Sequence, residues 1–172
     1  IPPKTACLVC RAASTPAPVG GSAAAFGAAA AAARVAMVAR LTVGKKKYES
    51  VKERMWQMID QAEALRTSLT EGIERDAASF DAILAAFRLP KDTPEQETIR
   101  NTAVEQATIH AAEVPLEAAR QAVSVMELAF EAAAIGNVNC ISDAGSAMAL
   151  SLAALTAAGY NVQINISGLV NP

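Results

Sequence analysis

A carboxylate lies on the apolar face of a predicted helix in the stretch SLTEGIERDAASFDAILAAFRLPK, residues 68–91. The apolar positions recur every three or four residues, which is typical of a buried helical face, and Asp76 falls on that face between Ile73 and Phe80. A carboxylate removed from water must pair with a cation, accept strong hydrogen bonds or become easier to protonate. Two interpretations of Asp76 stay open: a group that does acid–base chemistry, and a polar core residue that fixes helix register.

The other acids and the single histidine are weaker candidates for chemistry. Asp81 lies on the same predicted helix and is expected to be exposed to solvent. Asp143 follows Ser142 at a predicted helix N-terminus, where negative charge is favoured, so capping explains it adequately. His110 lies one turn before Glu113, and the two side chains are close enough to meet. A structural role is the more ordinary interpretation of this histidine.

Cysteine content and charge exclude several classes of protein. The chain has three cysteines, which are too few for a disulfide scaffold and favour a reducing, cytoplasmic environment. Cys7 and Cys10 form a C-x-x-C but lack the two further ligands of a structural zinc site, so no metal is expected. The formal net charge of −2 argues against nucleic-acid binding. Residues 19–39 are mostly alanine and glycine and contain Arg34, so we expect a soluble protein with no membrane segment.

Alanine supplies much of the 52% hydrophobic content, and aromatic residues make up only 4%. This composition favours closely packed helices over a bulky core. A first helix is predicted over residues 22–43, capped by Ser22 and small and apolar on nearly every face, so it should be central. Gly20 and Gly21 precede it and present backbone N–H groups to an anionic or carbonyl-bearing ligand. A second helix is predicted over residues 49–89.

The sequence DTPEQ, residues 92–96, combines a capping threonine, a proline at the first helical position and a glutamine partner, which marks a helix start. This third helix is expected to reach Val114, where Pro115 either kinks it or begins a new helix that ends at Ile135. A fourth helix is predicted over residues 143–158. The segment NVQINISGL, residues 161–169, alternates apolar and polar residues and predicts a short strand or an extended tail.

These elements predict an all-α protein, an antiparallel bundle of long helices around an alanine-rich central helix. Residues 1–17 are expected to form an irregular lead-in, and residues 18–172 a single domain. Six segments carry a further resemblance: PVGGSAAAFGAA (18–29), MVARLTVGKKKY (37–48), RDAASFDAILAAFRLPK (75–91), EVPLEAAR (113–120), GNVNCISDAG (136–145) and NVQIN (161–165). In this order they resemble the formiminotransferase-cyclodeaminase C-terminal family, which includes bacterial methenyltetrahydrofolate cyclohydrolases.

The resemblance implies a helical enzyme of one-carbon folate metabolism that forms a homodimer or a larger homo-oligomer. It also implies that no metal or tightly bound cofactor takes part. The expected reaction is hydrolysis of 5,10-methenyltetrahydrofolate to 10-formyltetrahydrofolate. The alternative is a cyclodeaminase, which closes the formimino derivative and releases ammonia. A non-catalytic helical assembly module is the second alternative.

The resemblance implies site residues as well. Asp76 and Asp143 would be the catalytic carboxylates beside the cationic amidinium carbon of the substrate. The substrate would be bound by backbone donors of the glycine loop, by lysines that hold the glutamate carboxylates and by amides that hydrogen-bond the pterin ring: Gly20, Gly21, Ser22, Lys45, Lys46, Lys47, Asn137 and Asn139. The family pattern has three glycines before the serine, and this chain has Val19 in place of the first.

Overall fold

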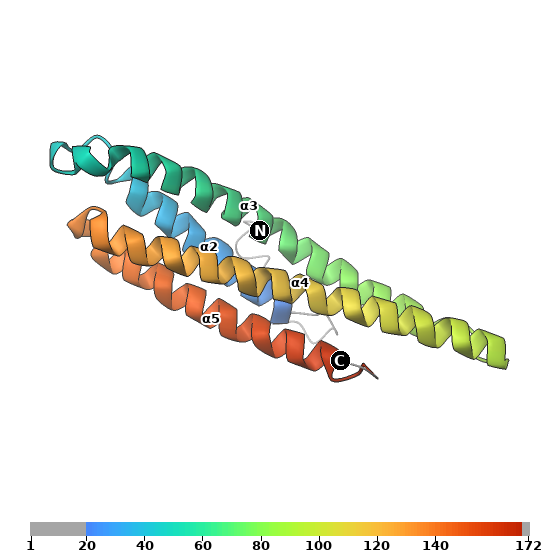
Figure 1. Ribbon diagram of the computed structural model, residues 1–172. Coiled ribbons are helices and arrows are strands. Elements are labelled where there is room, and N and C mark those ends of the chain that lie inside the picture. Colours follow the sequence, from blue (N-terminus) through green and yellow to red (C-terminus); the bar gives the residue numbers. More distant parts are fainter. Residues whose placement is uncertain (1–19, 170–172) are drawn as a thin grey trace, which may run out of the picture.

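The structure is a computed structural model that describes residues 20–169. In this part of the chain four long α-helices lie side by side, with two short 3₁₀ helices in the connections (Figure 1). The elements in chain order are α2 (Gly20–Arg40), η1 (Lys46–Val51), α3 (Lys52–Phe87), α4 (Pro94–Ile135), η2 (Val138–Cys140) and α5 (Ile141–Ile166). The all-α fold class predicted from the sequence is confirmed.

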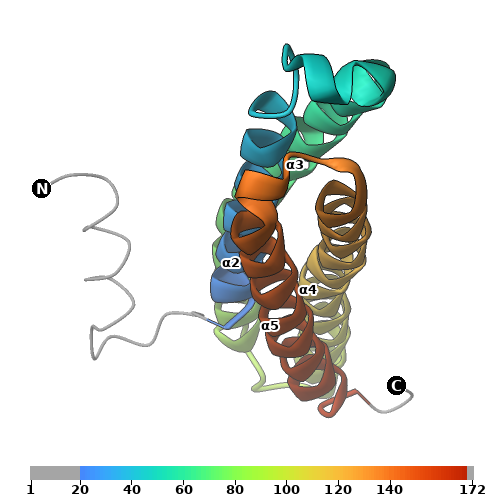
Figure 2. The ribbon, with the colours of Figure 1, turned by 90° about the vertical axis from the view of Figure 1, so that its left-hand side faces the viewer.

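Helix α2 packs against each of the other three long helices, and Figure 2 shows it alongside α5. Its buried side chains are mainly alanine and valine: Ala24, Ala25, Ala28, Ala29, Ala31, Ala32, Val35, Ala36, Val38 and Ala39. Such small side chains allow close approach of neighbouring backbones. A Cβ added at Gly27 would lie 3.6 Å from the Cβ of Ala154 on α5. The predicted alanine-rich central helix is therefore confirmed.

Two helical stretches of the described chain are long and apolar enough to cross a membrane by length and hydropathy alone. In α2 the relevant window is 61% buried inside the protein, as expected for the core helix of a bundle. In the second stretch, Val138–Ile166, the window is only 28% buried. Asp143 is the single charged residue of α5. This helix therefore presents an exposed and nearly uncharged face.

Helices α3 and α4 are longer than α2 and α5 and extend past them as a two-helix arm (Figure 1). We define the arm as residues 77–110. Few of its side chains are buried: Ser79 and Ala86 on α3, and none on α4 before Ala111. At the tip, Thr93 caps α4 as predicted, because its side chain accepts a hydrogen bond from the backbone N–H of Gln96.

Pro115 neither ends α4 nor begins a new helix, because α4 continues through it from Pro94 to Ile135. A proline has no backbone N–H, so the carbonyl four residues earlier loses its helical partner. That carbonyl belongs to Ala111, and the side-chain Nδ2 of Asn165 on α5 donates a hydrogen bond to it at 2.7 Å. A carboxamide from α5 thus replaces the bond that Pro115 removes.

The strand predicted over residues 161–169 is wrong, because α5 runs without a break from Ile141 to Ile166. Alternation of apolar residues suggested a period of two, but Ala158, Val162 and Asn165 also follow helical spacing. Ala158 is fully buried and Asn165 bonds to α4. Gly159 does not adopt the positive φ of a glycine that ends a helix, and α5 continues through it.

Candidate functional site

Asp76 lies where α3 passes the first turn of α2, and its side chain is only 7% exposed. Its Oδ2 accepts two hydrogen bonds from Ser22, one from the backbone N–H and one from the hydroxyl, both at 2.7 Å. The first backbone N–H groups of a helix have no partner within it, and the helix dipole favours negative charge there. Asp76 therefore caps α2 from a neighbouring helix.

The second carboxylate oxygen of Asp76, Oδ1, lies against Gly21 and differs from Oδ2 in its hydrogen bonding. Oδ1 receives no hydrogen bond from any described residue, yet no fully buried side-chain oxygen in this part of the chain lacks a partner. Oδ1 must therefore keep some exposed surface. Asp76 therefore has one oxygen held by Ser22 and a second oxygen without a hydrogen-bond partner among the described residues.

Two glycines allow side chains from other helices to approach the backbone of α2. A Cβ on Gly21 would lie 2.7 Å from Cγ of Asp76, and a Cβ on Gly20 would lie 2.8 Å from Cγ of Asn161 on α5. Real Cβ atoms are not found at such distances from other heavy atoms. The site thus joins Gly20, Gly21, Ser22, Asp76 and Asn161, of which sequence reasoning missed only Asn161.

Asp143, the other predicted catalytic carboxylate, is not part of this cluster in a single chain. Its Oδ1 forms an ion pair with Nη1 of Arg34 at 2.8 Å, and the two side chains are 31% and 46% exposed. Arg34 and Ser22 are twelve residues apart on α2, which corresponds to about 18 Å along the helix. Within one chain, Asp143 and Asp76 therefore occupy separate places.

The predicted lysines lie farther away, beyond the C-terminal end of α2. Lys45, Lys46 and Lys47 are exposed on the turn that leads into η1. The Nζ of Lys47 lies 5.4 Å from the centre of the Tyr48 ring. Because α2 is about 30 Å long, these cations cannot contact a ligand at Asp76 of the same chain.

Asn137 and Asn139 are at the same distant end. The Nδ2 of Asn137 donates to the carbonyl of Leu41 at 3.0 Å, and its Oδ1 accepts from the backbone N–H of Asn139 at 3.1 Å. Its backbone N–H donates to the hydroxyl of Thr42. The side chain of Asn137 therefore joins the loop to the end of α2, whereas Asn139 is exposed. Their predicted role toward a pterin stays a prediction.

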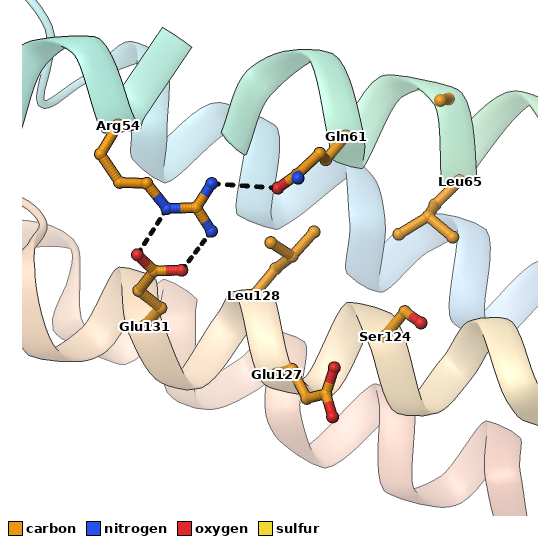
Figure 3. Close-up of a pocket in the computed structure, with 8 residues that line it drawn as sticks. Arg54, Gln61, Leu65, Ser124, Glu127, Leu128 and Glu131 are labelled. Carbon is orange, nitrogen blue, oxygen red and sulfur yellow. Dashed lines mark hydrogen bonds and ion pairs between the residues drawn. The ribbon is translucent and has the colours of Figure 1, made fainter. Parts of the chain in front are cut away.

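A groove of about 590 Å³ lies between α3 and α4 (Figure 3), and none of the residues that line it belongs to the cluster around Asp76. The guanidinium of Arg54 forms two bonds to the carboxylate of Glu131, of which the one from Nε measures 2.6 Å. Its Nη1 also donates to Oε1 of Gln61 at 3.2 Å. The hydrogen bonds that Glu131 accepts from Arg54 hold the pKa of its carboxyl below the usual range. Glu127 also lines the groove.

We expect Glu131→Gln to lower the free energy of unfolding by about 0.5–1 kcal/mol at pH 7, as for a partly exposed ion pair. Because the folded protein has the lower pKa, the stabilisation is present above the carboxyl's ordinary pKa of about 4.3 and disappears as the pH falls through the lowered value. Urea unfolding at pH 7 and at about pH 3 measures both values. Glu127→Gln, in the same groove, is the control and should change neither. Equal losses at both pH values would contradict the prediction.

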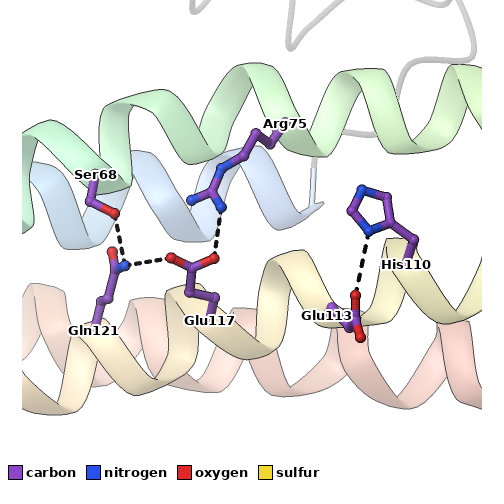
Figure 4. Close-up of polar contacts among 6 residues, drawn as sticks. All are labelled: Ser68, Arg75, His110, Glu113, Glu117 and Gln121. Atoms are coloured by element: carbon purple, nitrogen blue, oxygen red, sulfur yellow. Dashed lines mark hydrogen bonds and ion pairs between the residues drawn. The ribbon is translucent and has the colours of Figure 1, made fainter.

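A second series of polar contacts connects α3 and α4 nearer to Asp76 (Figure 4). Nη1 of Arg75 lies 2.7 Å from Oε2 of Glu117, whose other oxygen accepts from Gln121 at 2.9 Å. The hydrogen bond to Glu117 raises the pKa of Arg75.

Among the described residues no group of three or more histidine, cysteine and acidic side chains could hold a metal ion.

The predicted contact of His110 with Glu113 is present in the structure. Nδ1 of the imidazole lies 3.4 Å from Oε2 of Glu113, and both side chains are about two-thirds exposed (Figure 4). His110 is the last residue of the arm. Asp81, also on the arm, is exposed as predicted. None of these three side chains belongs to the cluster around Asp76.

Comparisons with known proteins identify the family of the chain. The family model of formiminotransferase-cyclodeaminase matches residues 8–172. The chain is 43% identical over 158 residues to methenyltetrahydrofolate cyclohydrolase of Methylorubrum extorquens, covering 92% of this chain and 76% of that one. It is 34% identical over 155 residues to formimidoyltransferase-cyclodeaminase of Rattus norvegicus, covering 90% of this chain but only 29% of the rat protein.

A solved structure has the same fold. The crystal structure of formiminotetrahydrofolate cyclodeaminase from Thermotoga maritima superposes with a TM-score of 0.81 at 27% identity, covering 92% of this chain and 75% of that chain. The resemblance seen in the six sequence segments is thus confirmed both by sequence and by structure. The chain belongs to the formiminotransferase-cyclodeaminase family.

Proposed function

We propose that this protein hydrolyses 5,10-methenyltetrahydrofolate to 10-formyltetrahydrofolate, with Asp76 as the catalytic carboxylate. Two findings support the proposal: the 43% identity to a methenyltetrahydrofolate cyclohydrolase, and the buried carboxylate that is held by Ser22 through Oδ2 while Oδ1 has no hydrogen-bond partner among the described residues. The second observation carries the proposal, because it gives the chemistry a specific atom.

The reaction suits a fixed carboxylate. In the substrate, the one-carbon unit joins two nitrogens as a cationic amidinium, which an adjacent carboxylate stabilises. Water adds to this carbon, and its proton passes to Oδ1 of Asp76. One carbon–nitrogen bond of the tetrahedral intermediate then breaks as the leaving nitrogen takes this proton back, and the hydroxyl proton of the intermediate is released to solvent as the carbonyl of the formyl group forms. The formyl product results, and the proposed steps need no metal and no tightly bound cofactor.

Cyclodeamination of formimino-tetrahydrofolate is the second candidate, favoured by the 34% identity to the rat enzyme. The two reactions are separated by supplying each substrate to the purified chain. Loss of methenyl absorbance beyond the spontaneous rate supports the hydrolase, and ammonia release from the formimino compound supports the cyclodeaminase. If neither compound reacts and no folate binds, the chain is a helical assembly module and the proposal is wrong.

We further propose that two copies associate through the outer face of α2 and α5. We define this α2–α5 face by its small and apolar side chains: Ala23, Ala30, Ala33, Met37, Ala149, Leu150, Ala153, Ala157, Tyr160 and Ile164. Tyr160 and Ile164 are 67% and 68% exposed. The charges of Arg34 and Asp143 at this face neutralise each other. Two helices about 30 Å long and together about 20 Å wide cover ~600 Å², close to the ~800 Å² that each partner contributes to a standard interface.

A twofold axis perpendicular to these helices would also complete the site. Gly20 on α2 lies beside Asn161 of α5, and Arg34 lies beside Asp143, so the two helices are antiparallel. In such a dimer the Asp76 end of one copy faces the end of its partner that carries Asp143 and the lysines. The substrate tail could then reach those cations, which the single chain places too far away.

We place this homodimer in the cytoplasm, in keeping with the free, buried thiol of Cys140.

We expect Ala153→Glu to give a monomer with little turnover, because it introduces an unpaired charge at the centre of the α2–α5 face. Light scattering after size exclusion measures the mass, and the methenyl assay measures turnover. Ala64→Glu, an exposed alanine on the opposite side of the bundle, should remain dimeric and active. A wild-type monomer that floats with phospholipid vesicles would instead assign the face to a membrane.

A further inference from the structure

Asn161 reaches the Asp76 site from α5, in the part of this helix beyond the predicted end at residue 158. Its carboxamide lies over Gly20, and its Nδ2 donates to the carbonyl of Ala157 at 2.8 Å. Oδ1 accepts no hydrogen bond from any described residue, and the side chain is half-buried. Asp76 and Asn161 therefore flank the first two residues of α2 from different helices.

The carboxamide packs against Gly20, but hydrogen bonding within the protein does not explain why this side chain is polar. Its one hydrogen bond returns to its own helix four residues earlier, so it joins no two elements. Asparagine is also a poorer helix former than alanine. Asn165, one turn later, differs in this respect, since it bonds across to Ala111 of α4. The neighbouring Asn165 has a structural partner, and the open polar atom of Asn161 has none.

We propose that Asn161 is a substrate-binding residue that recognises the lactam edge of the pterin ring. This inference rests on the proposed function. A lactam presents an N–H and a carbonyl side by side, and a carboxamide presents the complementary pair. In methenyltetrahydrofolate the lactam carbonyl is next to the ring nitrogen that carries the one-carbon unit. Side chains that flank two consecutive residues, Gly20 and Gly21, are therefore suitably placed to contact both parts.

The test compares two ligands on two variants. Folinic acid contains the lactam, and p-aminobenzoylglutamate is the tail without the ring. We expect Asn161→Ala to weaken folinic acid binding about tenfold, as for the loss of one hydrogen bond, and to leave p-aminobenzoylglutamate binding unchanged. Isothermal titration gives both dissociation constants. In turnover, KM for methenyltetrahydrofolate should rise by a similar factor with kcat within about threefold.

Asn165→Ala is the matched control, because it removes the same group one turn away. It should lower the melting temperature, since the Ala111 carbonyl loses its partner, and leave both dissociation constants unchanged. If Asn161→Ala does not fold, Asn161→Leu preserves the side-chain volume over Gly20 without polar atoms and must show the same tenfold loss. Unchanged folinic acid binding by the folded variants overturns the role of Asn161. Absence of folinic acid binding by the wild type overturns the proposed function instead.

Discussion

Asp76→Asn is expected to lower kcat for methenyltetrahydrofolate at least ~100-fold while the protein remains folded, the range found for loss of a general acid–base group. Asparagine has nearly the same shape, and its oxygen can still accept hydrogen bonds from Ser22. It carries no charge, however, so it neither stabilises the amidinium nor takes the proton from the attacking water. Steady-state kinetics measures kcat, and circular dichroism measures the helical content.

The loss of turnover in Asp76→Asn must be distinguished from the effect of weaker capping of α2. Weaker hydrogen bonds to Ser22 are expected to cost about 1–2 kcal/mol of stability. Ser22→Ala removes one of these bonds but leaves the carboxylate charged, so it should lose a similar amount of stability and much less activity. Asp81→Asn, on the exposed side of the same helix, should change neither quantity. Full turnover by Asp76→Asn would show that Asp76 caps α2 and has no catalytic role.

Gly21→Ala has the second large effect that we expect, on activity and on stability together. The new Cβ would overlap the carboxylate of Asp76. The carboxylate cannot withdraw without breaking both of its bonds to Ser22. We expect a loss of about 1–3 kcal/mol in the free energy of unfolding, as for an overpacked buried position, with kcat falling by at least ~10-fold. Urea unfolding and steady-state kinetics measure the two effects.

Gly159→Ala is the matched control for the glycine substitution. This glycine lies inside α5, and a Cβ there would meet nothing within 4 Å. Because alanine is the better helix former, the control should gain about 0.5–1 kcal/mol and retain its activity. If Gly21→Ala behaves like this control, the contact with Asp76 does not restrict the first turn of α2.

Much of the fold could be predicted because the local signals act within a few residues. The alanine content predicted the central helix, and DTPEQ predicted the start of α4 at the correct residue. The apolar stripe of α3 identified Asp76 as a buried carboxylate, which the structure confirms. These features depend on periodicity and capping, and both can be read from sequence.

The arrangement of the site could not be predicted in the same way. Spacing along the chain does not show that Asp76 meets Ser22, since that contact depends on how α3 lies against α2. Nor does the spacing show that Asp143 pairs with Arg34, which lies about 18 Å along α2 from Ser22. The position of Asn161 beside Gly20 was missed because the alternation from residue 161 onward suggested a strand, which would have placed its side chain elsewhere.

Pro115 has a consequence for α5 as well as for α4. Because it removes one backbone donor, the carbonyl of Ala111 depends on Asn165, which is one turn beyond Asn161. If α5 slipped along α4 by a single turn, the carbonyl oxygen of Ala111 would lose its hydrogen-bond donor, and a different residue would lie over Gly20. Pro115 thereby penalises the slipped arrangement, whereas the packing of α5 against α2 and α4 holds the native one even when Asn165 is replaced.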